Sequence, residues 1–348
     1  MKIIFATHEG VPLYRGGPYI KMIETKKQLE SRGIETCYFD MWKANEQLAD
    51  CDLVHLFGAN FAVYNLARNL KSRNIKFVVN PIFYTRRSPA FVRQITRIDK
   101  LTRKYFRGLW WDYGFTREIC EWAEMVLPNT IAEGDIIADG MGVPKSKFKV
   151  IHNGVSKEFM DGDPALFKKQ YGLENFILNV GHIGPKRKNM LALVRALQKI
   201  DHPAVLIARV MNTGEAKAVV EKIKHSKNIL LIEGLPNNSP LLASAYAACD
   251  VFAMPSQFET PGRAALEAAL AGAKIVITPH GGTKDYFENI AEYVNPYSID
   301  DIKQKIEKAL NKPKTNLLKE HIRKNFLWEK ITQDTIDVYN KVLDIEPE

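Results

Sequence analysis

The stretch that decides the fold reads SQFETPGRAALEAALAGAKIV over residues 256–276. Two glutamates, Glu259 and Glu267, flank a segment that contains Pro261 and Gly262. The apolar run VFAM comes just before, so the predicted order is a strand, a tight turn and a helix. Ligands of an open α/β sheet bind at the carboxyl ends of strands, and N–H groups at a helix start can face an anion. A loop carboxylate and a helical carboxylate would then bind two separate hydroxyl groups of one elongated ligand.

Two glutamates at this spacing carry little weight alone, because the helix dipole already favours an acidic residue near a helix start. The full string, however, resembles the nucleotide-sugar signature of the retaining glycosyltransferases of family four, which have the GT-B fold. The resemblance covers nearly the whole chain and is strongest over residues 176–280. It implies that Glu259 contacts the donor sugar as a catalytic residue and that Glu267 contacts the nucleotide ribose. It also implies that Pro261 and Gly262 belong to the donor site.

A second motif, ILNVGHIGPKRKNM, begins at residue 177. In the family that it resembles, an Arg follows the glycine and a Lys comes several residues later, and this cationic pair holds the donor diphosphate. Here Gly181 is followed by His182, which departs from that pattern. The later cation is matched by Lys188 or, because the loop is one residue longer, by Arg187. Taken alone, basic residues in a loop are most often a solvated surface.

Three further residues complete the donor-binding prediction. Gly16 and Gly17 follow the first predicted strand, where glycines let backbone N–H groups approach a phosphate or a sugar. Their spacing is not GxGxxG, which disfavours a nicotinamide cofactor. The resemblance places both glycines beside the diphosphate and the acceptor, and it places Leu235 beside the base. We expect no cofactor and no catalytic metal, since no CxxC pair or clustered His and carboxylates mark a metal site.

Chain length and alternation set the architecture. At 348 residues the chain predicts two domains, and apolar runs that alternate with helix-like segments predict two parallel sheets with crossover helices. We therefore expect an α/β GT-B chain with two Rossmann-like domains facing a central cleft. An acceptor-binding domain would span 1–155 and a nucleotide-sugar-binding domain 156–325. Residues 317–343 are expected to be helical, and 326–348 would pack back on the first domain.

Positive charge gathers in one predicted helix. The first 155 residues carry 23 Lys and Arg against 16 Asp and Glu, and the net charge of the chain is +9. Five cations recur at helical spacing, and two tryptophans follow them: Arg93, Arg97, Lys100, Lys104, Arg107, Trp110 and Trp111. The opposite face is apolar, with Phe91, Ile95, Ile98, Tyr105 and Leu109. Anionic lipid headgroups or a phosphate-bearing lipid acceptor fit this stripe, and nucleic acid fits less well. The alternative is an apolar face buried on the sheet under a solvated basic face.

These observations favour a retaining glycosyltransferase that moves a hexose-type sugar from a nucleotide diphosphate sugar to a hydroxyl of a lipid-linked or glycan acceptor. Four scattered cysteines and no apolar run of membrane-spanning length favour a cytoplasmic protein, peripheral on the inner face of a membrane. Two alternatives stay open: a nucleotide-sugar epimerase or phosphorylase on the same fold, and a non-catalytic module that binds anionic membranes. The sequence does not name the sugar, the base, the acceptor or the oligomeric state.

Overall fold

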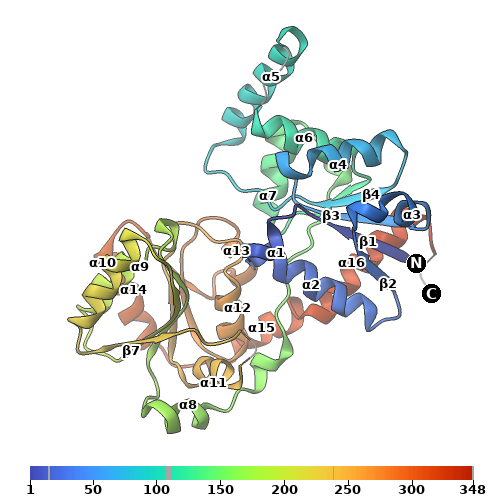
Figure 1. Cartoon of the computed structure of the whole chain (residues 1–348). Helices are drawn as coiled ribbons and strands as arrows, with labels where there is room; N and C mark the ends of the chain where they lie inside the picture. The colour runs from blue at the N-terminus through green and yellow to red at the C-terminus, as the bar shows by residue number, and fades with distance from the viewer. Residues whose placement is uncertain (15, 107–110, 238, 347–348) are drawn as a thin grey trace. The chain divides into compact units, whose positions relative to one another are not determined.

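The computed structural model covers residues 1–348 and describes all of them except 15, 107–110, 238 and 347–348; the side chains of Tyr14 and Lys104 are also left undescribed. The chain forms two compact units. The first consists of Met1–Gly154 together with Trp328–Glu348, and the second of Val155–Leu327. Figure 1 shows both units with their elements labelled.

The first unit is built on a five-stranded, fully parallel sheet of order β2-β1-β3-β4-β5. Its central strands are buried along their whole length and mostly apolar, because helices cover both faces of the sheet. The strand order reverses between β1 and β3, so loops at the carboxyl ends of these strands are free to hold a ligand. The strands are β1 (Lys2–Ala6), β2 (Glu35–Tyr38), β3 (Leu53–Phe57), β4 (Phe77–Asn80) and β5 (Met125–Val126).

The helices of this unit include the last helix of the chain, α16, which packs on α2. The indole of Trp328 lies against Gly154, where an added Cβ would meet the ring at 2.3 Å. The predicted return of the C-terminal helix to the first unit is therefore confirmed. The helices are α1 (Val11–Tyr14), α2 (Gly17–Glu30), α3 (Ala44–Ala49), α4 (Phe61–Ser72), α5 (Pro89–Tyr105), α6 (Asp112–Trp122), α7 (Ile131–Asp135) and α16 (Trp328–Leu343), with the short turns η1 (Met41–Lys43), η2 (Ile136–Gly140) and η3 (Lys145–Lys147).

The second unit holds a six-stranded parallel sheet of order β11-β10-β9-β6-β7-β8. Strand order runs in opposite directions on the two sides of the β6–β9 pair, which makes this pair the topological switch point. The carboxyl ends of β6 and β9 are therefore where this sheet would bind a ligand. The strands are β6 (Ile177–Ile183), β7 (Ala204–Val210), β8 (Ile229–Glu233), β9 (Val251–Met254), β10 (Lys274–Ile277) and β11 (Glu292–Tyr293).

Helices cover both faces of the second sheet and bury two apolar clusters against it. The helix predicted over 317–343 is two helices in the structure, because Val155 N–H donates to the Phe326 carbonyl and so draws the backbone out of helical pairing. The helices are α8 (Pro164–Tyr171), α9 (Met190–Leu197), α10 (Gly214–Lys224), α11 (Pro240–Ala248), α12 (Arg263–Leu270), α13 (Thr283–Phe287), α14 (Ile299–Leu310) and α15 (Leu317–Asn325), with η4 (Lys157–Asp161) and η5 (Lys186–Lys188).

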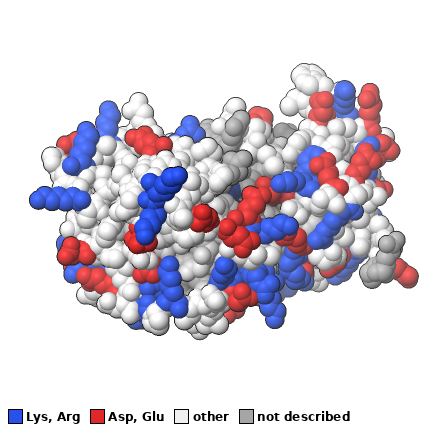
Figure 2. Space-filling model, turned by 90° about the horizontal axis from the view of Figure 1, so that it is seen from below, with Lys and Arg blue, Asp and Glu red and all other residues white. Residues whose placement is uncertain are grey.

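Charge on the face seen from below is mixed. Figure 2 shows Lys and Arg side chains there lying among Asp and Glu side chains, without one large basic field. Within the residues that the structure describes, no helix has the length and apolar character needed to cross a bilayer.

Candidate functional site

The predicted residues of the second unit gather around the β6–β9 switch point. The loop after β6 carries Arg187 and Lys188, and the loop after β9 carries Glu259. Glu267 lies on α12, which follows the same β9 loop. Gly181 and His182 are in the last residues of β6 itself, paired with Ala208 and Arg209 of β7. The sheet of the second unit therefore brings together, at its carboxyl end, cations and carboxylates from different loops. Their positions along the sequence do not by themselves require this.

Glu259 and the two cations form the centre of this site. The Lys188 ammonium lies 2.6 Å from Glu259 Oε1, and the nearer guanidinium nitrogen of Arg187 lies 3.5 Å from the same oxygen. Arg187 also stacks over the ring of Phe258, with 5.3 Å from its Cζ to the ring centroid. The Lys188 side chain is 17% exposed and that of Arg187 is 44% exposed. Lys188 is therefore the inner cation of the pair, and Arg187 is the outer one.

The loop that carries Lys188 is fixed by Asn189. This residue adopts the left-handed conformation (φ 57°), which ends η5 and starts α9. Its side-chain amide donates to the carbonyls of Pro255, at 2.9 Å, and Pro296, at 2.6 Å. The Gln257 N–H also donates to the Arg187 carbonyl at 2.7 Å. These bonds tie the loops after β6, β9 and β11 together, so the cations are held near Glu259 by backbone anchors as well as by charge.

The cations set the protonation of the site. Burial by itself would raise the pKa of Glu259, but Lys188 and then Arg187 outweigh it and hold that pKa below its ordinary value. Glu259 is therefore an anion at neutral pH. Burial and the same two cations, with Arg209, lower the pKa of His182. His182 is consequently neutral at neutral pH and is no substitute for a permanently charged arginine.

Glu267 is a buried carboxylate with two donors. Tyr246 donates its hydroxyl proton to Glu267 Oε2 at 2.8 Å, and Arg263 lies one helical turn earlier with its Nε 3.0 Å from Oε1. Burial raises the pKa of Glu267 despite Arg263, which opposes that effect. Our sequence analysis did not identify Tyr246 or Arg263. Arg263 lies at i−4 of Glu267, which is a detectable helical signal, whereas Tyr246 comes from α11 and is brought close only by the fold.

The turn before α12 favours glycine at position 262. Gly262 is the N-cap in the left-handed region (φ 84°), and an added Cβ would lie 3.2 Å from the Met254 sulfur and 3.5 Å from the Glu259 Cβ. The peptide between Thr260 and Pro261 is cis. Together these residues turn the chain from the Glu259 loop into α12, so that Glu259 and Glu267 lie on the same side of the switch point.

The segment around Gly281 hydrogen-bonds to the backbone of the Glu259 loop. Glu259 N–H donates to the His280 carbonyl at 3.0 Å, and Gly282 N–H donates to the Glu259 carbonyl at 2.9 Å. Gly281 has φ 104°, and a Cβ there would lie 2.0 Å from the Glu259 carbonyl oxygen. Only glycine permits this close backbone approach.

We therefore expect Gly281→Ala to displace Glu259 and to lower turnover more than tenfold, since misplacing a reacting group by about 1 Å can cost on the order of 100-fold. The matched control is Gly272→Ala, because Gly272 also has a positive φ (97°) but open space around its Cβ position. Both variants should lose stability from backbone strain. Equal turnover in the two variants, measured at the same temperature, would contradict the role of Gly281.

The remaining donor-binding predictions are placed as follows. Leu235 follows β8 and packs, half-buried, on the core of the second unit. Gly16 and Gly17 belong to the first unit, where Gly16 caps α2 and Gly17 begins it. A Cβ at Gly17 would meet nothing within 4 Å, so this position leaves the start of α2 open. The roles assigned to these three residues stay predictions.

Our sequence analysis missed two buried ionisable residues of the first unit, Lys21 and Glu133, which both hydrogen-bond to Asn129. Lys21 on α2 donates to Asn129 Oδ1 at 2.5 Å and to the Ile151 carbonyl at 2.9 Å. Burial lowers its pKa to about 7, and Glu133 opposes that shift. Burial raises the pKa of Glu133, which accepts from the N–H groups of Phe83 and Asn129. In the sequence, Lys21 is indistinguishable from Lys26 and Lys27 of the same helix, neither of which is buried.

The cationic stripe of the first unit is present in part. Arg93, Arg97 and Lys100 are exposed on α5. Arg107, Leu109 and Trp110 lie outside the described residues, as does the side chain of Lys104. The apolar side of the helix is not buried on the sheet: Leu101 is 62% exposed and Tyr105 is 70% exposed. Instead the buried positions are Val92, Thr96 and Asp99. The interpretation of an ordinary helix with a buried apolar face is therefore wrong.

Over the parts of the chain that the structure describes, no group of three or more His, Cys, Asp or Glu side chains is arranged to hold a metal ion.

Comparisons with known proteins agree with this geometry. Residues 166–325 match the family model described as "Glycosyl transferases group 1". This part of the chain is similar to the group 1 glycosyltransferases. An uncharacterized glycosyltransferase of Methanocaldococcus jannaschii is 26% identical over 222 residues, which are 58% of this chain and 56% of that relative. The match thus spans only about half of the relative's length.

Solved structures show the fold of the whole chain. Sucrose-phosphate synthase from Thermosynechococcus elongatus superposes with a TM-score of 0.76 at 16% identity, covering 99% of both chains. The Anabaena protein HepE, solved in complex with UDP-glucose, superposes with a TM-score of 0.69 at 17% identity, covering 98% of this chain and all of that one. The two parallel-sheet α/β units therefore constitute a GT-B fold, as predicted.

Proposed function

We propose that the protein is a retaining glycosyltransferase that moves a hexose-type sugar from a nucleotide diphosphate sugar to a hydroxyl group. The observation that carries this proposal is the arrangement at the β6–β9 switch point. There, Lys188 and Arg187 meet Glu259, while Glu267 is held by Tyr246 and Arg263 within the group 1 segment. HepE was solved with UDP-glucose, which supports the same class of donor for this chain.

Each side chain would have one task. Lys188 and Arg187 would bind the donor diphosphate and stabilise the charge that develops on it as the bond to the sugar breaks. Glu259, kept ionised by them, would accept a hydrogen bond from a sugar hydroxyl, and Glu267 would accept from the ribose. The leaving diphosphate would help to deprotonate the acceptor hydroxyl on the same face of the sugar, so the anomeric configuration is kept. The protein then contributes position and electrostatics.

The acceptor would be a lipid-linked or glycan hydroxyl at the cytoplasmic face of a membrane. The net charge of +9 supports attraction to a surface rich in anionic lipid. The exposed cations Arg93, Arg97 and Lys100 on α5 support the first unit as the part that meets the acceptor. A sugar acceptor that carries phosphate would be attracted by the same positive charge. Assays with each acceptor in turn distinguish a lipid-linked acceptor from a phosphorylated sugar.

The experiment that tests the function starts with nucleotide diphosphate sugars screened for thermal stabilisation of the protein. A stabilising donor is then incubated with lipid-linked and glycan acceptors, and the anomeric configuration of the product is read by NMR. Transfer with retention is expected. Release of an epimerised sugar without acceptor would show the epimerase alternative, and a requirement for free phosphate would show the phosphorylase alternative.

We expect catalysis to survive chelation, because the cationic side chains supply the charge that a metal would otherwise supply at the diphosphate. Turnover in EDTA should stay within about twofold of turnover in magnesium, since removing even one such donor would cost on the order of 100-fold. Loss of activity in EDTA that magnesium or manganese restores would contradict this expectation.

A further inference from the structure

Helix α5 buries polar side chains and exposes apolar ones, which is the reverse of the usual pattern. The face that packs into the first unit is largely polar, with Asp99 fully buried beside Thr96. The outward face carries Phe91, Ile98, Leu101 and Tyr105, all exposed, and exposed Phe106 continues it past the helix end. Figure 1 shows α5 extending outward beyond α4 and α6. A helix on the surface of a globular unit ordinarily buries its apolar stripe, and an exposed apolar stripe marks a surface for protein or membrane interaction.

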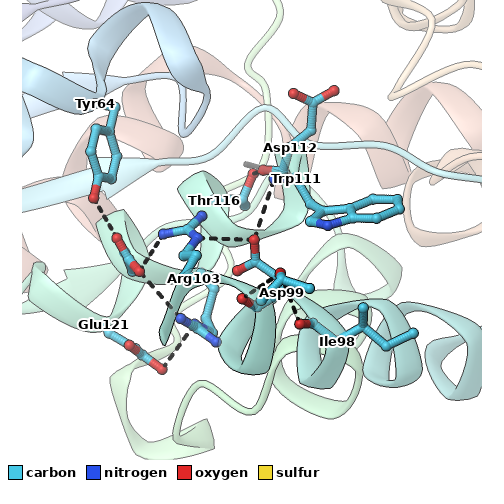
Figure 3. A network of polar contacts seen from close by, with 11 residues as sticks. Tyr64, Ile98, Asp99, Arg103, Trp111, Asp112, Thr116 and Glu121 are labelled. Atoms are coloured by element: carbon cyan, nitrogen blue, oxygen red, sulfur yellow. Dashed lines mark hydrogen bonds and ion pairs between the residues drawn. The ribbon is translucent and has the colours of Figure 1, made fainter. Parts of the chain in front are cut away.

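A buried polar network fixes the rotation of α5 (Figure 3). Arg103 lies between two carboxylates, with its Nε 2.9 Å from Asp99 Oδ1 and its Nη1 2.6 Å from Glu118 Oε1. Tyr64 of α4 donates to the other oxygen of Glu118, and Trp111 N–H donates to Asp99 at 3.3 Å. Turning α5 to bury its apolar stripe would break these pairs, which are costly to separate when buried. The network therefore keeps the apolar stripe turned outward.

Cations border this apolar stripe. At 3.6 residues per turn, Arg97 and Lys100 lie on the strip of α5 next to Leu101. Both are exposed, and neither has an acidic partner among the residues that the structure describes. Arg93, on the same strip, donates through Nε to the Asp139 carbonyl at 2.9 Å, so its charge is not neutralised there. A cationic strip beside an apolar strip matches the headgroup and acyl layers of an anionic bilayer.

We infer that α5 is an interfacial helix that lies in an anionic lipid bilayer, with Leu101, Ile98 and Tyr105 in the acyl boundary and Arg97 and Lys100 at the headgroups. This rests on the proposed function, and it specifies the acceptor as one that is presented from that bilayer. A second copy of the chain is a poorer partner, because a twofold contact would bring the two cationic strips together.

The test uses sedimentation with phosphatidylcholine vesicles, with and without phosphatidylglycerol. Wild type is expected to bind only the anionic vesicles, and added salt should weaken that binding. Arg97→Gln with Lys100→Gln should lower the partition coefficient about 30-fold, from the known attraction per basic residue. Ile98→Gln with Leu101→Gln should lower it more than tenfold through lost apolar burial.

Matched controls lie on the second unit. Lys217→Gln with Lys227→Gln removes the same charge from exposed positions, and Leu317→Gln removes an exposed leucine. Both controls should bind vesicles like wild type. Equal binding of the α5 variants and the controls would overturn the inference. It would also be overturned if Ile98→Gln with Leu101→Gln turned a dimer into a monomer and left vesicle binding unchanged, because the stripe would then be a self-association surface.

The same samples separate this inference from the proposed function. Stabilisation by a nucleotide diphosphate sugar reports on the second unit and should be unchanged in every α5 variant. Stabilisation without vesicle binding would overturn the inference and leave the proposed function standing. Vesicle binding without stabilisation by any donor would leave the inference standing and count against the transferase.

Discussion

Replacing Lys188 by Ala is expected to lower turnover by about 100-fold to 1,000-fold, the effect seen when one preorganised donor to a developing charge is removed. Lys188 is the inner cation of the site, 2.6 Å from Glu259. The change removes charge at the leaving diphosphate and also raises the pKa of Glu259, since Lys188 is the main group that opposes burial there. Turnover is measured as release of nucleoside diphosphate with the donor that stabilises the wild type.

The control is Lys186→Ala in the same turn. Lys186 is exposed, so its loss changes the net charge equally without touching Glu259. It should keep turnover within about twofold of wild type, as surface charges contribute little. Similar losses in the two variants would reduce the role of Lys188 to general positive charge. Full activity in Lys188→Ala would assign the diphosphate to Arg187 instead.

Replacing Glu267 by Ala is expected to weaken nucleoside diphosphate binding more than tenfold. A hydrogen bond to a charged group contributes about 1.5–3 kcal/mol, and the variant loses the bonds to the ribose. Glu259→Ala should instead act mainly on turnover, because Glu259 meets the transferred sugar. Affinity is measured by calorimetry with the nucleoside diphosphate alone, which lacks the transferred sugar that Glu259 would bind.

Folding must be checked in this variant, because Tyr246 and Arg263 lose their partner when Glu267 is truncated. Glu267→Gln keeps the volume and an oxygen that can accept from Tyr246, so it separates loss of binding from loss of structure. Glu221→Ala, on an exposed face of α10, is the surface control. Wild-type affinity in both Glu267 variants would remove this residue from the donor site.

The sequence by itself determined the architecture and predicted the central residues of the candidate site. Alternating apolar runs and helical segments specified two parallel sheets, because strands buried on both faces must be continuously apolar. The spacing of Glu259 and Glu267 around a glycine turn carried little weight alone, and the resemblance of the full string to the family-four signature indicated the candidate site. The basic segment after β6 was also visible from its position, with Lys188 as the closer match to the family pattern and Arg187 as the alternative.

Tertiary structure decided what depends on contacts between distant segments. Asn189 ties three loops together next to Lys188, the inner cation, and Gly281 approaches the Glu259 backbone from the loop after β10. The orientation of α5 was decided in the same way. The sequence left open whether its apolar positions were buried, and in the structure Arg103 pairs with Asp99 on the same helix and with Glu118 on α6, so that this polar side faces the interior. A buried charge is tolerated only next to an opposite charge. The position of Glu118 in the fold therefore decided which face of α5 remains exposed.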